Sequence, residues 1–305
     1  MKRTTLKIFA LSALAASGLF TAQANAAEPM PVVASFSILG DLVQVVGGDR
    51  VKVTTLAGPD ADAHEFTPSP ADAKAVLGAR VFVVNGLSFE PWAQKLAKSA
   101  GYKGETVVAS KGVKPRQMAA EAGHDKGHAE TDPHAWQNPL NVVQFVNNIA
   151  AGLAKADPTG AATYQANAEA YAKQLKDFDA QAKAQFDAIA TVKRKVITSH
   201  DAFGYMGARY GITLLSPEGV NTDSEPSAKH VAELIRQIKR EKIKAVFVEN
   251  MSNPKLMAQL SKDAGVSVGA TLYSDALSEA SGPAPTYLKM MNHNLTQLIS
   301  GMKLN

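Results

Sequence analysis

Three histidines and one aspartate are the residues of this sequence best placed to do chemistry together. His64, His200 and Asp275 each follow a predicted strand, and His134 precedes a predicted helix. In open α/β sheets, ligands bind outside the carboxyl ends of the strands. Three imidazoles and one carboxylate fill a tetrahedral zinc site and leave no coordination position for a catalytic water. These residues therefore predict a closed ion site, although no compact motif such as H-E-x-x-H supports it.

The chemistry of this set favours zinc. Imidazole suits zinc, whereas an all-oxygen set suits magnesium, calcium or manganese. The sequence contains no cysteine, so thiolates cannot contribute ligands. Three aromatic residues close to the candidate ligands in sequence, Trp136, Phe203 and Tyr205, are expected to form an apolar wall that limits the access of water to the ion.

Three further residues have two interpretations each. Glu249 closes a predicted strand and points toward the same cleft, where it either replaces Asp275 as a ligand or orients a ligand histidine. His124 and His128 lie in a polar, charged segment that runs from residue 114 to 131 and reads as an exposed loop. These two histidines either collect metal for the site or are merely solvated.

The elements that must position these residues have the pattern of an α/β protein. Short β-branched runs alternate with helical segments, which predicts βαβ units and a mainly parallel sheet flanked by helices. The pattern occurs twice, so we expect two α/β lobes. The predicted strands are Val32–Phe36, Val51–Leu56, Arg80–Asn85 and Thr106–Ala109 in the first half, and Lys195–Ser199, Ile212–Leu215, Ala245–Glu249 and Val266–Leu272 in the second.

A long helix is predicted between the two sets of strands. Asp157 and Pro158 suit the N-cap and the first helical position. Apolar residues recur at steps of three and four from Tyr164 to Ile189, which forms one stripe along a helix. A helix from Pro158 to about Ala190 would be roughly 50 Å long at 1.5 Å per residue. A coiled-coil segment is the alternative, but a rigid helix that joins two lobes agrees better with the two sets of strands. The predicted division is an N-terminal lobe at 27–156, a linking helix at 157–192 and a C-terminal lobe at 193–305.

The first 26 residues have the features of a secretory signal peptide. Three basic residues precede an apolar run, Ile8–Phe20, that is shorter than the roughly 20 residues of a membrane span. An A-x-A pattern then predicts cleavage after Ala26. The rest of the chain has 29 basic and 28 acidic residues, so the high isoelectric point does not indicate a nucleic-acid-binding surface. Because a lipid anchor would need a cysteine, we expect a soluble periplasmic protein.

Six motifs occur in an order that resembles a known family. They are D-A-D-A-H-E-F-T-P-S-P, T-D-P-H-A-W-Q-N-P, V-I-T-S-H-D-A-F-G-Y, S-E-P-S-A, F-V-E-N-M-S-N-P-K and L-Y-S-D. This pattern is similar to the cluster A-I solute-binding proteins, the zinc and manganese receptors of ABC transporters, over nearly the whole chain after residue 26. The resemblance implies two α/β lobes joined by one rigid helix, with the ion between them. It also implies ligand roles for His64, His134, His200 and Asp275.

The resemblance further implies capture of zinc and its delivery to the membrane permease of an ABC importer, by a protein acting as a monomer. Receptors for manganese and iron in this family tend to have glutamate at the third ligand position, where this chain has His200. A manganese or iron receptor remains the alternative, because the segment before His134 has fewer histidines than in many zinc receptors. A periplasmic zinc hydrolase would use Glu249 or Asp201 as its base but would need an open coordination position. An adhesin would need display at the cell surface.

Overall fold

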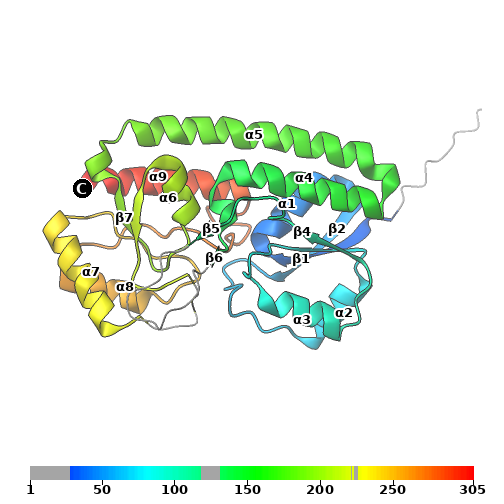
Figure 1. The fold of residues 1–305 in the computed structure, drawn as a ribbon, viewed down its shortest axis with the longest axis horizontal. Coiled ribbons are helices and arrows are strands. Elements are labelled where there is room, and N and C mark those ends of the chain that lie inside the picture. Colours follow the sequence, from blue (N-terminus) through cyan, green and yellow to red (C-terminus); the bar gives the residue numbers. More distant parts are fainter. Residues whose placement is uncertain (1–27, 118–130, 221, 223–225) are drawn as a thin grey trace, which may run out of the picture.

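Two α/β lobes lie side by side along one long helix (Figure 1). The computed structural model describes residues 28–117, 131–220, 222 and 226–305. The predicted signal peptide and residues 118–130, which include His124 and His128, lie outside these described residues. The predicted fold class, two α/β lobes joined by a long helix, is confirmed.

A four-stranded parallel sheet forms the centre of the N-terminal lobe. Its strands are ordered β2-β1-β3-β4. Along β1, Val32 and Ala34 belong to the main hydrophobic core, whereas Val33 belongs to a second core on the opposite face of the sheet. Burial on both faces explains why these strands read as short apolar runs. The strands are β1 (Met30–Phe36), β2 (Val51–Ala57), β3 (Val81–Val84) and β4 (Glu105–Val108).

Helices cover both faces of this sheet. Two of them, α1 (Ser37–Gly47) and α4 (Pro139–Ala156), pack in the main core, and α2 (Pro70–Gly78) and α3 (Pro91–Ser99) pack in the second core. Residues at the start of a helix can fix where that helix begins, as α2 shows. At α2, the Ser69 backbone N–H donates to the Asp72 carboxylate over 2.7 Å, and the Asp72 N–H donates back to the Ser69 hydroxyl. This is a capping box, and proline occupies the first helical position.

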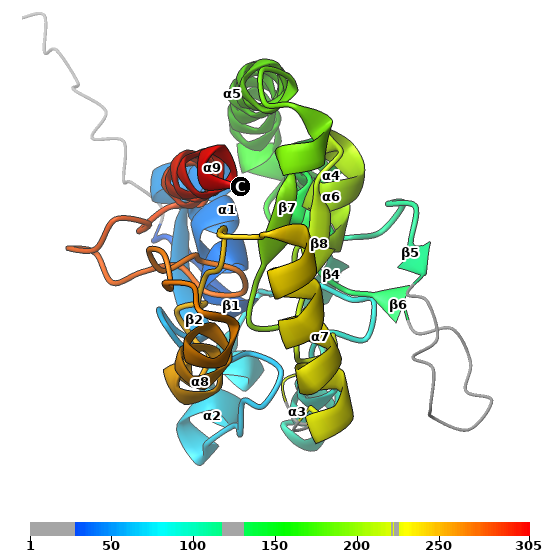
Figure 2. The same ribbon diagram turned by 90° about the vertical axis from the view of Figure 1, so that its left-hand side faces the viewer.

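The C-terminal lobe has less regular strands than predicted. Among the described residues of this lobe, only β7 (Lys195–Ile197) and β8 (Thr213–Leu215) form a ladder, and the predicted strands 245–249 and 266–272 contribute single parallel bridges at Ile197–Val246 and Glu249–Leu272. Residues 267–270 are exposed, so they lack the packing that stabilises a strand. The lobe's helices are α6 (Gly204–Tyr210), α7 (Ala228–Glu241), α8 (Pro254–Ala264) and α9 (Tyr287–Leu304), with α7 and α8 adjacent at the end far from α5 (Figure 2).

The helix α5 (Ala161–Asp187) extends over both lobes (Figure 1). Its 27 residues give a length of about 40 Å at 1.5 Å per residue. This is shorter than predicted, because Pro158–Gly160 form a separate 3-10 turn and because the helix ends at Asp187 instead of near Ala190. The predicted apolar stripe is buried from end to end, against α1 and α4 in one lobe and α6 and α9 in the other. Neither α5 nor any other described helix combines the length and apolarity needed to cross a membrane.

An arginine–aspartate–tyrosine cluster fastens α5 at each lobe. At the N-terminal lobe, Asp157 accepts hydrogen bonds from Arg50 and from the hydroxyl of Tyr164. At the C-terminal lobe, Asp179 of α5 accepts hydrogen bonds from Arg209 and Tyr210 of α6. Since the main hydrophobic core also contains residues of both lobes, a wide opening of the lobes would expose buried apolar surface.

Candidate metal centre

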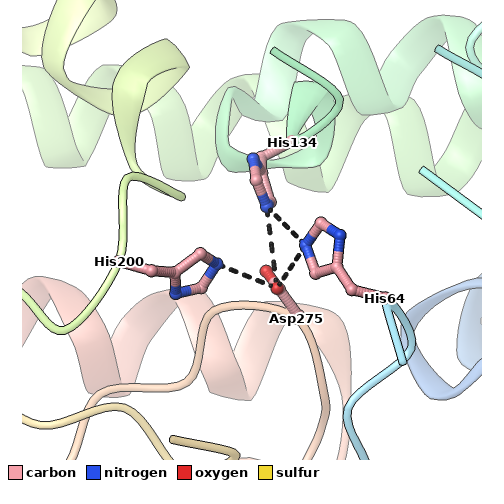
Figure 3. Close-up of side chains that lie close together, drawn as sticks. All are labelled: His64, His134, His200 and Asp275. Atoms are coloured by element: carbon pink, nitrogen blue, oxygen red, sulfur yellow. Dashed lines mark hydrogen bonds and ion pairs between the residues drawn. The ribbon is translucent and has the colours of Figure 1, made fainter. Parts of the chain in front are cut away.

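The loops at the ends of the strands bring the four predicted residues together between the lobes (Figure 3). His64 lies in the loop between β2 and α2, and His134 follows the short strand β6 (Thr131–Asp132). His200 lies between β7 and α6, and Asp275 lies in the loop before α9. The side chain of His64 is 4% exposed, and the other three are fully buried.

The carboxylate of Asp275 lies at the centre of this cluster. Its Oδ2 atom is 3.1 Å from His200 Nε2, 3.3 Å from His64 Nε2 and 3.6 Å from His134 Nε2. All four ligand atoms lie within 4.8 Å of one another. A tetrahedral ion with bonds of about 2.0–2.2 Å separates its ligand atoms by about 3.3–3.6 Å. The cluster therefore has the dimensions of a site for one transition-metal ion.

The second carboxylate oxygen of Asp275 supports this interpretation. Its Oδ1 atom is buried and has no hydrogen-bond partner among the residues that the structure describes. A buried acceptor without a partner destabilises the folded chain. A cation bound beside this carboxylate would compensate that cost, so the donor set fits a divalent metal ion as cargo.

An aspartate two residues earlier in the chain positions each histidine of the N-terminal lobe. The backbone N–H of His64 donates to Asp62 Oδ1 over 2.8 Å, and that of His134 donates to Asp132 Oδ1 over 3.0 Å. Such Asx turns are a local property of the sequence pattern Asp-x-His. Asp132 Oδ1 also lies 2.9 Å from His134 Nδ1 and so fixes the orientation of the ring.

A second carboxylate fixes His200. Glu249 Oε1 accepts a hydrogen bond of 3.0 Å from the backbone N–H of His200. Its Oε2 atom lies 2.6 Å from His200 Nδ1, an ion-pair contact although the two atoms are not aligned as a hydrogen bond. Glu249 therefore lies behind the ligand ring and not among the four ligand atoms, which agrees with an orienting role.

Carboxylates around the cluster favour protonated imidazoles when metal is absent. Burial acts to lower the pKa of His134, but the charge of Asp275 and the contact with Asp132 outweigh it and raise the pKa to about 9. Burial also opposes protonation of His200, but Glu249 and Asp275 raise its pKa well above the usual value. Burial acts to raise the pKa of Asp275, yet the two histidines hold it well below its usual range. Metal must therefore displace protons to bind.

Aromatic rings close the cluster on the side of the N-terminal lobe. Trp136 lies edge-on to His134, with ring centroids 5.3 Å apart, as predicted. Phe89, which lies in no motif near the candidate ligands, is edge-on to His64, with ring centroids 4.5 Å apart. Tyr205 forms hydrogen bonds in addition to any apolar contact. Its hydroxyl donates to the carbonyl of Asp132 and accepts from the backbone N–H of Arg116. The apolar rings limit access of water to the ligand nitrogens.

Hydrogen bonds across the lobes hold the loop of Asp275. The carbonyl of Ser274 accepts from Trp136 Nε1 and from Gln137 Nε2, both over 2.8 Å. On the other side of Asp275, the N–H of Leu277 donates to the hydroxyl of Ser37 over 2.9 Å. This loop of the second half of the chain is thus attached directly to the N-terminal lobe.

The structure brings all four predicted ligands together. The residues that orient these ligands by hydrogen bonds can be predicted from the sequence only in part. Asp132 supports His134 from two residues earlier in the chain, and the Asp-x-His spacing could have indicated this contact. The contact between Glu249 and His200 joins residues far apart in the sequence. His124 and His128 lie outside the described residues, so the prediction about them stays a prediction.

Fold and site together define a class: a two-lobed α/β binding protein with one enclosed cluster of metal ligands between its lobes. The chain belongs to the family described as zinc-uptake complex component A, periplasmic, which matches residues 32–301. The match covers both lobes and all four candidate ligands.

Relatives of this chain have names that refer to several metals. It is 33% identical over 297 residues to the manganese-binding lipoprotein MntA of Halalkalibacterium halodurans, covering 97% of this chain and 96% of the relative. It is 31% identical over 303 residues to the iron ABC transporter substrate-binding lipoprotein MtsA of Streptococcus pyogenes, with 97% and 96% covered. The periplasmic zinc-binding protein TroA of Treponema pallidum superimposes with a TM-score of 0.82 at 26% identity, covering 90% and 99%. The chain is thus a metal-binding receptor of the ABC-transporter class and not an enzyme.

Proposed function

We propose that this protein captures one zinc ion with His64, His134, His200 and Asp275 and delivers it to the membrane permease of an ABC importer. One observation carries the proposal: three imidazole nitrogens and one carboxylate oxygen converge within 4.8 Å in a buried cluster. Four protein ligands close the coordination sphere, which suits holding an ion.

Zinc is favoured over manganese by the ligand chemistry. Manganese binds preferentially to carboxylate, carbonyl and water oxygens, and three of the four ligands here are imidazoles. The third of them, His200, stands where manganese and iron receptors of this family tend to have a carboxylate. The names of MntA and MtsA, which refer to manganese and iron, make a manganese or iron receptor the competing assignment.

The proposal includes a place of action and a domain division. Residues 1–26 act as a signal peptide that is cleaved after Ala26, and the mature protein works as a monomer in the periplasm. The family description as periplasmic supports this location. The lobes comprise residues 27–156 and 193–305, with 157–192 as the linking segment.

Zinc titration of metal-free protein in the presence of a competing chelator tests the proposal. We expect one tight site, a large loss of affinity in His200→Ala, and unchanged affinity in His293→Ala, which alters a histidine on α9 outside the cluster. Competition between zinc and manganese, with elemental analysis of protein from its native periplasm, identifies the cargo. Full affinity in His200→Ala would contradict the site, and manganese as the native ion would contradict the choice of metal.

A further inference from the structure

The 85–92 turn, which runs from the end of β3 into the first residues of α3, contacts the peptide bonds from which both ligands of the N-terminal lobe extend. At the start of this turn, the fully buried Asn85 donates from Nδ2 to the carbonyl of Pro133 over 3.0 Å. Pro133 immediately precedes His134 in the chain. The backbone carbonyl of Asn85 accepts a hydrogen bond of 2.6 Å from the hydroxyl of Ser110, so the backbone at this residue is held in place.

The other end of the turn reaches the second ligand in the same way. Trp92 donates from Nε1 to the carbonyl of Ala63 over 2.7 Å, and Ala63 immediately precedes His64. Between the two contacts, Phe89 packs edge-on against the His64 ring. One turn of eight residues thus touches the backbone next to two ligands and the ring of one of them.

The backbone of this turn has an unfavourable conformation. Gly86, Leu87 and Ser88 all have positive φ values, of 84°, 55° and 64°. Glycine adopts this left-handed region readily, but it is uncommon for residues with a side chain. Such a conformation persists only where surrounding contacts hold it, and it is found preferentially at functional sites.

One buried carboxylate supplies these contacts. Glu90, which is 5% exposed, accepts hydrogen bonds from the backbone N–H of Asn85 and from the hydroxyl of Ser35 on its Oε1 atom. Its Oε2 atom accepts from the N–H of Gly86 over 3.3 Å. The carboxylate therefore links the end of the turn to its first two residues, and it also links the turn to strand β1.

We propose that Glu90 is a positioning residue for the metal site, because its carboxylate holds the 85–92 turn in the shape that aims His64 and His134 at a common ion. This inference rests on the proposed metal-capture function. Glu90 is not a ligand and does not contact one; it acts through Asn85 and Trp92. A carboxylate suits the role because two acceptor oxygens meet three donors, whereas a glutamine would offer one acceptor oxygen and place its amide NH2 group against an N–H donor.

Glu90→Gln is the central test, with zinc affinity and the visible absorption spectrum of Co²⁺-loaded protein as the two measurements. Loss of an outer contact to a metal site weakens affinity by roughly tenfold to hundredfold, and we expect a value near the lower end. The intensity of Co²⁺ absorption depends on the geometry of its ligands, so it should change as well. Ser35→Ala, which removes one of the three donors, should give a smaller change in the same direction.

Two conservative variants separate positioning from general destabilisation. Trp92→Phe keeps the aromatic packing and removes the donor to Ala63, and Asn85→Ala removes the donor to Pro133. Each should alter the Co²⁺ spectrum and lower zinc affinity, and if Glu90→Gln fails to fold, these two carry the test. The matched control is Leu153→Ala, fully buried at the end of α4 distant in sequence from His134, which should lower stability but leave the spectrum and the affinity unchanged.

The outcomes distinguish this inference from the proposed function. If wild-type protein lacks a tight zinc site that depends on His200, the metal-capture function itself fails. If wild-type protein binds zinc as proposed but Glu90→Gln, Asn85→Ala and Trp92→Phe keep its affinity and Co²⁺ spectrum, the positioning role of Glu90 is wrong. An equal effect in Leu153→Ala would also refute it, because the changes would then reflect stability alone.

Discussion

Zinc binding at neutral pH should release protons from the imidazoles of the site. Asp275 and Asp132 raise the pKa of His134 to about 9, so at pH 7 this imidazole is almost fully protonated in the metal-free protein. The pKa of His200 is also raised well above its usual value. A metal ion binds only the neutral ring, so each of these histidines must lose a proton when the ion enters.

The size of the effect follows from the pKa of His134. Removing its proton at pH 7, two pH units below a pKa of about 9, weakens apparent zinc affinity by roughly a hundredfold relative to pH above 9, or about 3 kcal/mol. The sign is fixed: a raised pKa in the metal-free state means that affinity grows as pH rises toward that pKa and falls as pH decreases. His200 adds a second proton and steepens the dependence.

Calorimetric titration with zinc in buffers of different ionisation enthalpy measures the number of protons released. We expect about two protons per ion at pH 7, and fewer in His134→Asn. His293→Asn, whose histidine lies outside the cluster, should release as many protons as wild type. Binding without proton release at pH 7, or affinity that does not change between pH 7 and pH 9, would refute the electrostatic reasoning.

Three further changes test other parts of the structure. Asp132→Asn should lower zinc affinity by roughly tenfold, because it weakens the contact that orients His134; chelator competition measures this, and unchanged affinity would contradict the orienting role. His200→Glu should shift the preference from zinc toward manganese, since it adds an oxygen ligand; an unchanged preference in direct competition would argue against control by this position. Leu175→Ala in α5 should lower the free energy of unfolding in urea by about 2–5 kcal/mol, whereas exposed Lys176→Ala should change it by less than about 0.5 kcal/mol.

The sequence predicted those features that depend on local pattern. The buried stripe of α5 and the strands of the N-terminal lobe follow from the periodicity and composition of their residues. Three of the four ligand positions follow predicted strands, and loops that follow parallel strands meet at one edge of a sheet. The family resemblance is what indicates that they act as ligands, because the four residues are far apart in the chain and form no compact motif.

Features that depend on tertiary contact were not predictable. The segments 245–249 and 266–272 have strand-like composition, but a ladder also needs a packed neighbour, and residues 267–270 are exposed. The positive φ values of Leu87 and Ser88 have no sequence signal, because neither residue favours that conformation. The turn they form depends on Glu90, whose contact with Ser35 spans 55 residues of sequence.

The lobe that holds a ligand in place is not always the lobe from which that ligand comes in the sequence. Two ligands come from each half of the chain, but the loop of Asp275 is attached to the N-terminal lobe through Ser274 and Leu277. Only His200, held by Glu249, depends wholly on the C-terminal lobe. Because α5 and the shared core oppose wide opening, a small displacement of the C-terminal lobe would withdraw one imidazole and leave three ligands on the ion. Loss of one ligand would open a coordination position through which an accepting site could take the metal, so the delivery proposed for this protein would require neither a wide hinge motion nor disassembly of the cluster.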